Sequence, residues 1–389
     1  MRNSMKKIPA VIVSHSVFMD KSDVFGPGHA VSQFLESKKI SHTYLKHSLY
    51  DSQKSRVIQT IKSKRRGKMR HEQSFFGPPP LRPITHLIQG VLTYRYLKSN
   101  PVHVCIAVNP LNAIAALLAK RHGYVSKVIL YTADYADQRF NNLLLNRIYH
   151  TIDHVAIKGA DRVWNTSTRI QKKRAEQGIE EVRNRFVPNA PHVALLKKKR
   201  DQRKIPTSMV LMANFTPSIN FKLILKVCAQ LKKKHPRIKL YFIGGGVMED
   251  EVKSLASKMG LKKNVTFHGF QDHEKALEIA AACKISLAIY GTSSAWTEYG
   301  DSLKARESLG LGLPVIITNN VSTSDDISRQ NAGFSIEMKP KKLFTAIDSL
   351  FTKPKLYKQM QANSIKLADM YDLSRIMNTE LYIPFLKQI

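Results

Sequence analysis

Cysteine is scarce in this sequence, and no long hydrophobic run occurs in it. The cysteines among 389 residues are three, far apart and in apolar surroundings, at Cys105, Cys228 and Cys283. Such sparse usage excludes a disulfide scaffold and a cysteine-ligated metal cluster, and it fits a reducing cytoplasm. The longest apolar stretch, Val104 to Ala119, is interrupted by Asn109-Pro110, so it falls short of the roughly 18 residues that a membrane-spanning helix needs. No signal peptide is visible, and we expect a cytoplasmic protein.

Acidic residues are also few. Asp and Glu number 29 against 62 Lys and Arg, which gives a formal net charge of +33 at pH 7. A chain with this charge needs an anionic partner or neighbourhood, because its own positive charges repel one another. Nucleic acid, an anionic membrane surface and phosphorylated substrates all meet that requirement.

Much of the positive charge is concentrated in one segment. Lys54 to Arg70 holds eight Lys and Arg and no Asp or Glu, and Phe75-Phe76 and three prolines follow it closely. Cations beside aromatic side chains suit the interface of an anionic bilayer. We expect this segment to hold the protein peripherally on the inner face of the cytoplasmic membrane. A solvated surface loop is the alternative.

Apolar runs of strand length alternate with helical segments along the sequence. They begin in the first half at Ile8, Val102, Lys127 and Asp161, and in the second half at Ser208, Ile238, Val265, Ile285 and Val315. Alternation of this kind predicts an α/β protein with parallel sheets and helices on both faces of each sheet. The length favours two such doubly wound domains.

Composition suggests where these domains begin and end. Prolines at 188 and 191, followed by the basic run Lys197 to Lys204, predict a linker at 191–206. We therefore expect an N-terminal domain at 1–190, a C-terminal domain at 207–370 and a last helix at 371–389 that packs back on the N-terminal domain. Ligands of doubly wound sheets bind beyond the carboxyl ends of the strands, so a cleft between the domains is the expected site.

The segment Glu298 to Asn319 is the most informative part of the sequence. It reads as a loop, a short helix capped by Asp301 or Ser302, a glycine turn and a buried strand. Lys304 and Arg306 then lie where helix amides are free, which suits a diphosphate. Glu307 lies one turn further on and suits recognition of a ribose hydroxyl. An ordinary surface helix with solvated charges is the alternative.

Motifs on either side of this helix resemble glycosyltransferase family 4, the retaining enzymes of GT-B fold. The resemblance covers about residues 208 to 370, and it lies in the order and spacing of the blocks Phe242 to Glu251, Asn264 to Phe270, Ala276 to Ala282 and Glu307 to Ile316. It implies two Rossmann-like domains that face a cleft, with the nucleotide sugar on the C-terminal domain and the acceptor on the N-terminal domain.

The resemblance also implies an activity. We expect a hexosyltransferase-like enzyme that transfers a sugar from a nucleotide-diphosphate sugar to a hydroxyl, in polysaccharide or glycolipid biosynthesis. The basic membrane segment favours a lipid-linked saccharide or glycolipid as acceptor. No Asp-x-Asp motif and no His or Cys pair with ligand spacing occurs in the sequence, so no metal cofactor is expected.

The C-terminal half departs from the family's pattern at a glutamate position and after its first strand, where Ala213 to Asn220 offer no cation before Lys222. The family has two glutamates with seven residues between them, and Glu307 matches the second, which binds the ribose. Tyr299 stands at the first position with Glu298 beside it, so Glu298 is the catalytic candidate there. The glycines around Gly245 precede three acidic residues that would repel a diphosphate, so they predict a tight strand-to-helix turn near the nucleoside.

Candidates in the N-terminal half are fewer. Gly26 and Gly28 precede a helix, where backbone amides can approach the donor phosphates, although a simple turn explains them equally well. Asp134 follows a buried strand and can orient or deprotonate the acceptor hydroxyl, or act only as a turn former. His15, after the first strand, is a further candidate.

Two other functions stay open. A nucleotide-sugar epimerase of the same fold would convert the donor without any acceptor. A basic nucleic-acid-binding protein would account for the charge, but no recognition-helix, RNA-binding or zinc pattern supports specific binding of nucleic acid.

Overall fold

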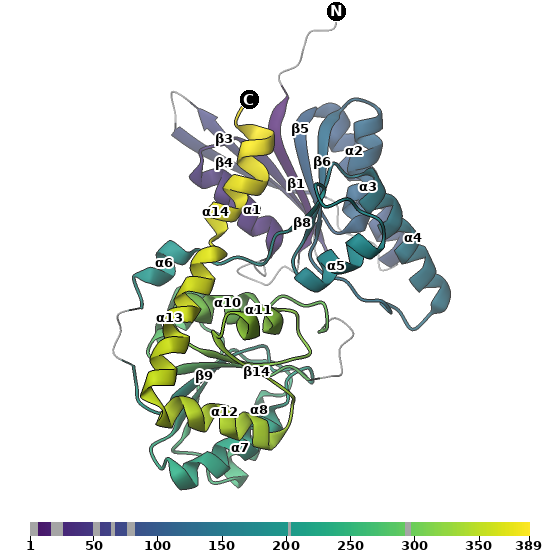
Figure 1. Cartoon of the computed structure of the whole chain (residues 1–389). Helices are drawn as coiled ribbons and strands as arrows, with labels where there is room; N and C mark the ends of the chain where they lie inside the picture. Colours follow the sequence, from purple (N-terminus) through teal and green to yellow (C-terminus); the bar gives the residue numbers. More distant parts are fainter. Residues whose placement is uncertain are drawn as a thin grey trace, which may run out of the picture. The chain divides into compact units, whose positions relative to one another are not determined.

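The computed structural model describes residues 7–16, 26–49, 55–63, 67–75, 82–200, 204–291 and 297–389, with the backbone alone at 61–63, 67–75 and 82–83. The chain forms two compact α/β units (Figure 1). The first unit comprises Met1–Pro188 and Leu373–Ile389, and the second comprises Asn189–Asp372. The chain therefore passes from one unit to the other twice.

The boundary differs from the expected linker at 191–206. That whole segment belongs to the second unit, where it contains the short helix α6, Val193–Lys197. Val193 and Leu196 are both buried there. Apolar side chains at these two positions pack into the unit, so the basic residues around them lie on its surface and do not form a free tether.

An eight-stranded sheet forms the first unit, in the order β4-β3-β2-β1-β5-β6-β7-β8. All neighbouring strands are parallel except the pairs β2–β3 and β3–β4. The strands are β1 Ile8–Ser16, β2 His42–Ser48, β3 Ser55–Ser63, β4 Gly67–Phe75, β5 Val102–Val108, β6 Val125–Thr132, β7 Arg162–Asn165 and β8 Asn184–Phe186.

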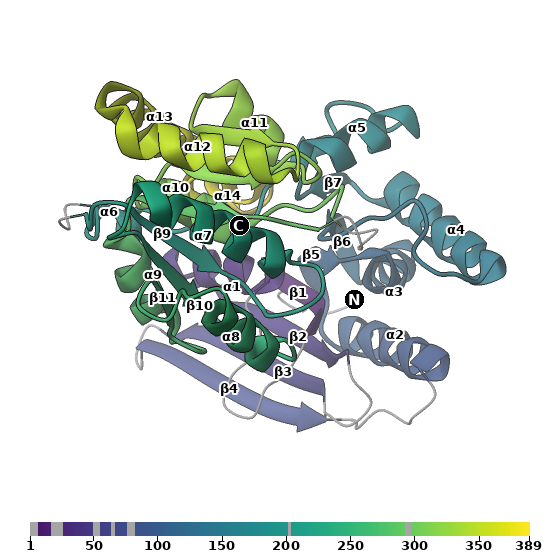
Figure 2. The ribbon, with the colours of Figure 1, turned by 90° about the horizontal axis from the view of Figure 1, so that it is seen from below.

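Helices cover both faces of this sheet, as the right-handed crossovers between parallel strands require. Figures 1 and 2 show α2, α3 and α4 side by side on one face, while α1 and the C-terminal α14 lie on the other. The helices of this unit are α1 Pro27–Ser37, α2 Arg82–Ser99, α3 Pro110–Arg121, α4 Leu143–Gly159, α5 Thr168–Glu176, α14 Leu373–Met377 and the π-helix η1 Asn378–Leu386.

The basic segment at 54–70 is not a loop where it is described. Its backbone forms β3 and β4, which pair as an antiparallel hairpin from Ser55 opposite Phe75 to Ser63 opposite Gly67. The hairpin continues the sheet to its edge. Phe76 and the cations Lys54, Lys64, Arg65 and Arg66 lie outside the described residues, as do the side chains at 61–63 and 67–75.

The second unit is a parallel six-stranded sheet in the order β11-β10-β9-β12-β13-β14. Its strands are β9 Ser208–Met212, β10 Lys239–Ile243, β11 Val265–Phe267, β12 Ile285–Ala288, β13 Val315–Thr318 and β14 Gly333–Ile336. Besides α6, its helices are α7 Phe221–Lys234, α8 Glu249–Lys258, α9 His273–Ala281, α10 Leu303–Gly310, α11 Thr323–Arg329, α12 Pro340–Thr352 and α13 Pro354–Met370.

Each sheet has one point where the order of the strands reverses. In the first unit the chain builds outward from β1 to β4 and then from β5 to β8, so the reversal lies between β1 and β5. In the second unit it lies between β9 and β12. Ligands of doubly wound sheets bind in the crevice at the carboxyl ends of such strands. None of the described helices is both long and apolar enough to cross a lipid bilayer.

Candidate functional site

A pocket of about 200 Å³ opens at the reversal point of the second unit. It lies where β9 and β12 end and α10 begins, and all of its walls come from this unit. The lining includes Ala213 and Asn214 after β9, Tyr290 after β12, and Ser302 and Lys304 at the start of α10. Topology and shape thus agree on the same place for a ligand.

Ser302 organises the start of α10. It is the N-cap residue, and its Oγ accepts a hydrogen bond from the Ala305 amide at 3.2 Å. The same Oγ lies 2.6 Å from the hydroxyl of Tyr290, whose pKa is raised by burial. The sequence predicted the cap at Asp301 or Ser302 and did not predict Tyr290. A fixed cap keeps the first amides of α10 directed toward the pocket.

Lys304 is the cation of α10 that reaches the pocket. Its side chain is exposed, and no hydrogen bond or ion pair joins it to another part of the described chain. A Lys ammonium beside free helix amides forms a site for an anion, because both carry positive charge toward the same space.

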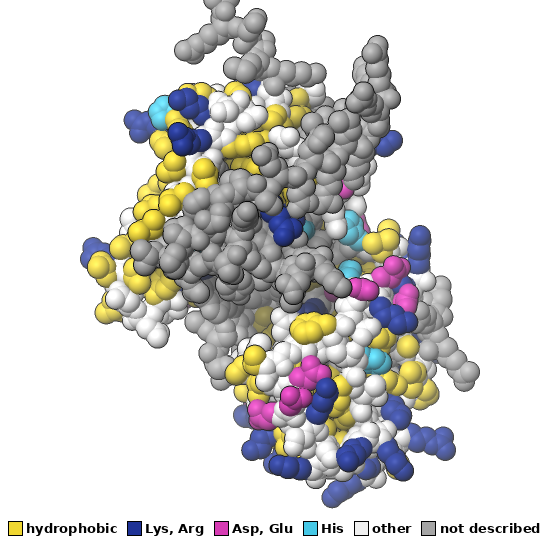
Figure 3. All heavy atoms as spheres, turned by 180° about the vertical axis from the view of Figure 1, so that it is seen from behind, with side chains coloured by type: hydrophobic (Ala, Val, Ile, Leu, Met, Phe, Trp, Pro, Cys, Tyr) yellow, Lys and Arg dark blue, Asp and Glu magenta, His cyan; other side chains and the backbone are white. Residues whose placement is uncertain are grey.

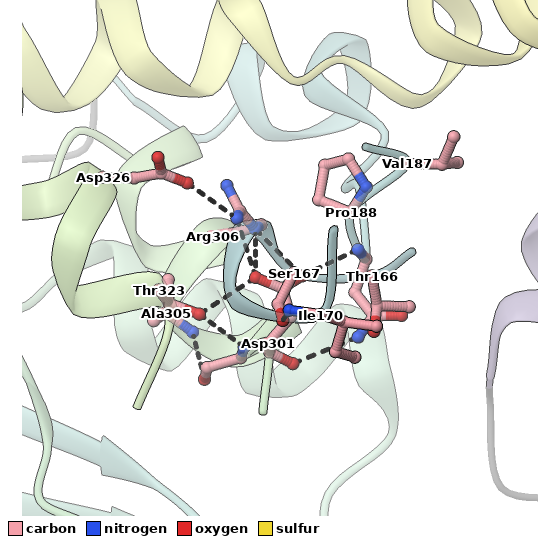
Figure 4. Close-up of polar contacts among 12 residues, drawn as sticks. Thr166, Ser167, Ile170, Val187, Pro188, Asp301, Ala305, Arg306, Thr323 and Asp326 are labelled. Atoms are coloured by element: carbon pink, nitrogen blue, oxygen red, sulfur yellow. Dashed lines mark hydrogen bonds and ion pairs between the residues drawn. The ribbon is translucent and has the colours of Figure 1, made fainter. Parts of the chain in front are cut away.

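Arg306 does not do what the sequence analysis expected of it. Its guanidinium is buried, and Nη2 lies 2.7 Å from Asp301 Oδ1 and 3.0 Å from Asp326 Oδ2 (Figure 4). Burial alone would lower the pKa of Arg306, but the two carboxylates outweigh it and raise the pKa above its ordinary value. Arg306 is therefore neutralised inside the protein, and the prediction of two cations facing a diphosphate is wrong for this residue.

Asp301 joins the loop before α10 to its surroundings. Besides the ion pair, one of its carboxylate oxygens accepts a hydrogen bond from the Thr323 hydroxyl at 3.0 Å, and the other accepts one from the Asn189 amide at 2.7 Å. The Thr323 oxygen in turn accepts from the Ser302 amide at 2.8 Å. Figure 4 shows Asp301 and Thr323 beside Arg306. This network fixes the α10 entrance, and its members are far apart in sequence, so no local pattern could have predicted it.

Glu307 is nearly buried on α10 and has a partner that the sequence did not suggest. Its Oε1 lies 2.6 Å from Nε2 of His273, at the start of α9. The hydrogen bond from His273 to Glu307 raises the pKa of His273, although burial opposes it. Glu307 does not line the described pocket, and its assignment to ribose hydroxyls stays a prediction.

The glycines around Gly245 form the tight turn that the sequence predicted, between β10 and α8. Gly244 has a φ of +121°, and a Cβ there would come within 2.0 Å of the Ala213 carbonyl oxygen. The Phe215 amide donates to the Gly245 carbonyl at 2.8 Å. The acidic residues 249–251 occupy the first turn of α8, as expected. Whether Gly245 contacts a nucleoside stays a prediction.

Tyr299 and Glu298 differ in exposure, although they are neighbours. Tyr299 is buried, and Glu298 is exposed in the turn that precedes α10. The residue at the family's first glutamate position is therefore part of the interior. The expectation that Glu298 acts on the donor sugar stays a prediction.

Gly26 and Gly28 begin α1 in the first unit. A Cβ on Gly28 would lie 2.3 Å from the hydroxyl oxygen of Tyr44, whereas a Cβ on Gly26 would meet no described atom within 4 Å. Packing against Tyr44 explains Gly28 without a ligand, and the Gly26 amide already donates to Nδ1 of His29 at 3.2 Å. Donor binding by these glycines stays a prediction.

Asp134 follows β6 at the carboxyl edge of the sheet, as predicted. One of its oxygens lies 3.2 Å from Arg139 Nη1, and the same nitrogen donates to the Tyr149 hydroxyl at 3.0 Å. The Asp134 side chain is 43% exposed, so a second partner can reach it from solvent. It is thus an oriented carboxylate, and its role toward an acceptor stays a prediction.

His15 lies at the end of β1, beside the reversal point of the first sheet. Its Nε2 is 3.0 Å from Gln89 Oε1, and the Asn112 amide nitrogen is 3.1 Å from its Nδ1. Burial, with His86 nearby, lowers the pKa of His15 to about 4. The ring is therefore neutral near pH 7, donating to Gln89 and accepting from Asn112.

The cysteines are free and buried, as their apolar surroundings suggested. Burial raises the pKa of Cys105, Cys228 and Cys283 to about 12 in each case, so the thiols are unreactive at neutral pH. Within the described parts of the chain, His, Cys, Asp and Glu side chains form no group of three that could hold a metal ion.

Similar sequences agree with this geometry. Residues 195–367, which include α10 and its pocket, match the family described as "Glycosyl transferases group 1". A "Putative glycosyltransferase EpsD" of Bacillus subtilis is 27% identical over 327 residues, which span 78% of this chain and 80% of the relative. An "Uncharacterized glycosyltransferase" of Haemophilus influenzae is 24% identical over 244 residues, 61% of this chain and 65% of that protein.

Solved structures share the fold over nearly the whole chain. A sucrose-phosphate synthase from Thermosynechococcus elongatus has a TM-score of 0.70 at 13% identity and covers 99% of this chain and 100% of its own. Anabaena HepE in complex with UDP has a TM-score of 0.65 at 13% identity, with coverage of 98% and 100%. WaaG, a glycosyltransferase involved in lipopolysaccharide biosynthesis, has a TM-score of 0.62 at 15% identity, with coverage of 96% and 99%.

Proposed function

Because residues 195–367 belong to the group 1 glycosyltransferases and the chain is a glycosyltransferase of GT-B fold, we propose that it transfers a sugar from a nucleoside diphosphate donor to a hydroxyl acceptor, with retention of configuration. One observation carries the proposal: the pocket at the β9–β12 reversal, where a capped helix N-terminus and the exposed Lys304 converge. Anabaena HepE, which shares the fold, is described with UDP bound, in agreement with a nucleotide in such a domain.

The chemistry of this pocket suits a diphosphate leaving group. As the bond between sugar and phosphate breaks, negative charge grows on the phosphate oxygens. Fixed amides at the start of α10 and the Lys304 ammonium stabilise that charge without having to reorganise, which is often worth several kcal/mol per group. We propose that these groups, and no resident metal ion, neutralise the leaving group. Arg306 contributes indirectly, because its ion pair holds Asp301 and thereby the α10 entrance.

We propose the first unit as the acceptor domain. Its sheet also has a reversal point, and His15 and Asp134 lie at the carboxyl edge of the strands there. Asp134, oriented by Arg139, is the proposed group that orients or deprotonates the attacking hydroxyl. The charge of +33 favours an acceptor attached to a lipid, in a protein that works from the cytoplasm on an anionic membrane.

Donor binding tests the proposal most directly. A thermal-shift screen over UDP-, GDP-, ADP- and TDP-sugars should identify one base that raises the melting temperature, since a ligand of the native state stabilises it. Lys304→Gln should weaken that ligand about tenfold or more, and Glu307→Ala should remove the shift. Lys226→Gln, an exposed cation on α7, is the matched control and should leave the shift unchanged.

Two results would contradict the proposal. A wild-type melting temperature that none of the donors raises would exclude binding of these nucleotide sugars. A donor-induced shift in Lys304→Gln equal to that of wild type would show that the phosphates do not bind at α10. Incubating the enzyme with the identified donor alone separates transfer from epimerisation. Isomerised nucleotide sugar without any acceptor would establish the epimerase instead.

A further inference from the structure

The outer face of α2 carries exposed apolar side chains in its first part and basic side chains at its C-terminal end. Ile84, Leu87 and Val91 form one exposed stripe, and Leu87 is 71% exposed. The stripe continues on the same side of the helix with Arg95 and Lys98. Spacings of three and four residues place all five positions on one face. The stripe is therefore apolar along its first part and basic at its C-terminal end.

The neighbouring helices repeat this order. On α3, Leu118 is exposed, and Lys120 and Arg121 end the helix. On α4 several exposed apolar side chains precede Lys158 in the last turn. They are Leu143, Leu144, Leu145, Ile148 and Val155. Exposed apolar side chains on α2 and α4, and Leu118 on α3, thus precede basic residues at the C-terminal end of each helix, and on α4 the exposed Arg147 lies among them.

Packing brings the stripes together. α2 packs against α3 and α3 against α4, and Figures 1 and 2 show the three helices as one layer on the sheet. Each helix immediately precedes a strand of the parallel part of the sheet: β5, β6 and β7 follow α2, α3 and α4. Their C-terminal ends therefore meet at the edge where these strands begin, opposite to the carboxyl edge with Asp134. The basic residues collect at that edge.

A pocket of about 580 Å³ lies at this basic edge. Five cationic side chains and one carboxylate line this pocket. The cations are Lys120, Lys127, Lys158, Arg162 and Arg183, and the carboxylate is Asp161. Asp161 is shared by Lys120 at 2.6 Å and Lys127 at 3.3 Å. Arg183 donates to the carbonyls of Lys158 and Ala160 at the end of α4, so backbone contacts fix its guanidinium beside the pocket.

Acidic side chains are missing from the outer surface of the three helices. Neither α2 nor α3 contains Asp or Glu, and the one acid of α4, Asp153, is buried in an ion pair with Arg174. Figure 3 shows hydrophobic side chains with Lys and Arg on this flank of the first unit, and no Asp or Glu among the side chains described there. A partner that is apolar inside and negatively charged at its surface would complement this face.

We propose that the outer face of α2, α3 and α4, together with the cation-lined pocket at their C-terminal ends, docks on an anionic lipid bilayer. The inference rests on the membrane association in the proposed function and gives that association a surface. Apolar side chains enter the boundary between headgroups and acyl chains, while the basic edge and its pocket hold lipid phosphates. This surface is distinct from the β3–β4 hairpin, which lies at the edge strand of the same sheet.

Vesicle co-sedimentation tests the surface with the full chain. Vesicles of phosphatidylcholine containing phosphatidylglycerol should bind wild-type protein, and vesicles of phosphatidylcholine alone should bind it far less. Lys127→Gln with Arg162→Gln should weaken binding about fivefold per cation removed. Leu87→Ser with Leu144→Ser should weaken it tenfold or more at high salt, where the apolar contribution remains. Leu87, Lys127 and Leu144 are exposed and Arg162 is half-buried, so the fold should tolerate these changes.

Matched controls separate this surface from general charge and hydrophobicity. Lys226→Gln with Lys342→Gln removes two exposed cations from the second unit, and Leu195→Ser removes an exposed leucine there. Neither should change vesicle binding. Donor binding, measured by thermal shift in the same variants, should stay at the wild-type value, so that a failed docking surface is told apart from a failed glycosyltransferase.

Several results would overturn the proposal. Wild-type protein that ignores anionic vesicles would refute membrane docking, and so would variants of the helix face that sediment like wild type. If vesicle binding is lost only when Lys62, Lys64, Arg65 and Arg66 are replaced by Ser, the membrane-binding segment is the basic hairpin and not the helix face. Self-association abolished by Leu87→Ser with Leu144→Ser, without vesicle binding, would make the face a protein interface.

Discussion

Nε2 of His273 lies 2.6 Å from Oε1 of Glu307, so an exposed imidazole on α9 holds a carboxylate that is almost buried on α10. The hydrogen bond to Glu307 raises the pKa of His273 above its ordinary 6.5, and the charge of Glu274 adds to the effect. The pair joins α9 to α10, the helix whose first residues line the pocket. It also makes part of the protein's stability dependent on pH.

The pH dependence of this pair has a definite sign. A histidine with a raised pKa stabilises the native state fully below about pH 6.5, and the contribution is lost as the pH rises through the raised value. The difference in melting temperature between wild type and His273→Gln should therefore be largest near pH 6 and shrink toward pH 9. A constant difference across the range would contradict the pairing.

Breaking the Arg306 ion pair should be costly. Arg306→Met leaves the carboxylates of Asp301 and Asp326 buried without the guanidinium between them, which typically costs about 3–5 kcal/mol. Denaturant unfolding measures this loss. Arg329→Met removes an exposed arginine from the same Asp326 and should cost less than about 1 kcal/mol. Equal losses in the two variants would mean that burial of Arg306 is not decisive.

Removal of the α10 cap should affect both stability and donor binding. Ser302→Ala deletes the oxygen that accepts from the Ala305 amide, at a cost of about 1 kcal/mol, and it leaves the Tyr290 hydroxyl without this contact. Ser302→Thr keeps a capping oxygen and should recover most of the loss. Chemical denaturation gives the stability, and titration with the identified nucleotide gives the affinity. A stable Ala variant with full affinity would refute the role of the cap.

Gly26, the N-cap of α1, and Gly28, in its first turn, should respond differently to the same substitution. Gly28→Ala forces a methyl group against the Tyr44 hydroxyl and should destabilise the protein by about 1–3 kcal/mol. Gly26→Ala meets open space among the described atoms, and its φ of −152° is extended, so it should change stability by no more than about 0.5 kcal/mol. Equilibrium unfolding decides between them. A tolerated Gly28→Ala would show that Tyr44 moves aside.

Asp134 should matter for turnover and not for the donor. If it orients or deprotonates the acceptor hydroxyl, Asp134→Asn should lower kcat about 10²–10⁴-fold while the KM for the donor changes little. Asp137→Asn, a nearby carboxylate paired with Lys173, is the control and should retain activity. A wild-type kcat in Asp134→Asn would show that Asp134 has no role in turnover and serves only in the turn, paired with Arg139.

Much of the fold could be predicted from the sequence, because apolar runs of strand length follow directly from burial on both faces of a parallel sheet. The strands from Val102 and from Val315 lie where these runs predicted them. The β3–β4 hairpin was missed, since its many Lys and Arg residues and few apolar residues suggested a solvated or membrane-bound segment. The role of α6 was also missed, because its buried Val193 and Leu196 stand among basic residues that suggested a linker.

The candidate site was predictable only in its local part. A serine directly before a helix predicts an N-cap, so neighbouring residues were enough to predict the cap at Ser302 and the anion site at the start of α10 as a hypothesis. Whether a charged side chain faces a ligand or an interior partner depends on residues distant in sequence. Arg306 pairs with Asp326 and Glu307 with His273, and only the packing of α10 against other elements brings these side chains together.

The second passage of the chain between the units has a consequence for synthesis at the ribosome. The second unit is one uninterrupted stretch, so it can fold as soon as it has emerged, and domains generally do fold in this way. The first unit begins earlier but needs Leu373–Ile389, which are made after the second unit, and Arg185 on β8 must wait for Glu380 on η1, whose carboxylate it binds at 2.8 Å. Its apolar surface beneath α14 and η1 therefore stays uncovered until Leu373–Ile389 have been made, and a nascent chain paused after the second unit should be a preferred target of chaperones.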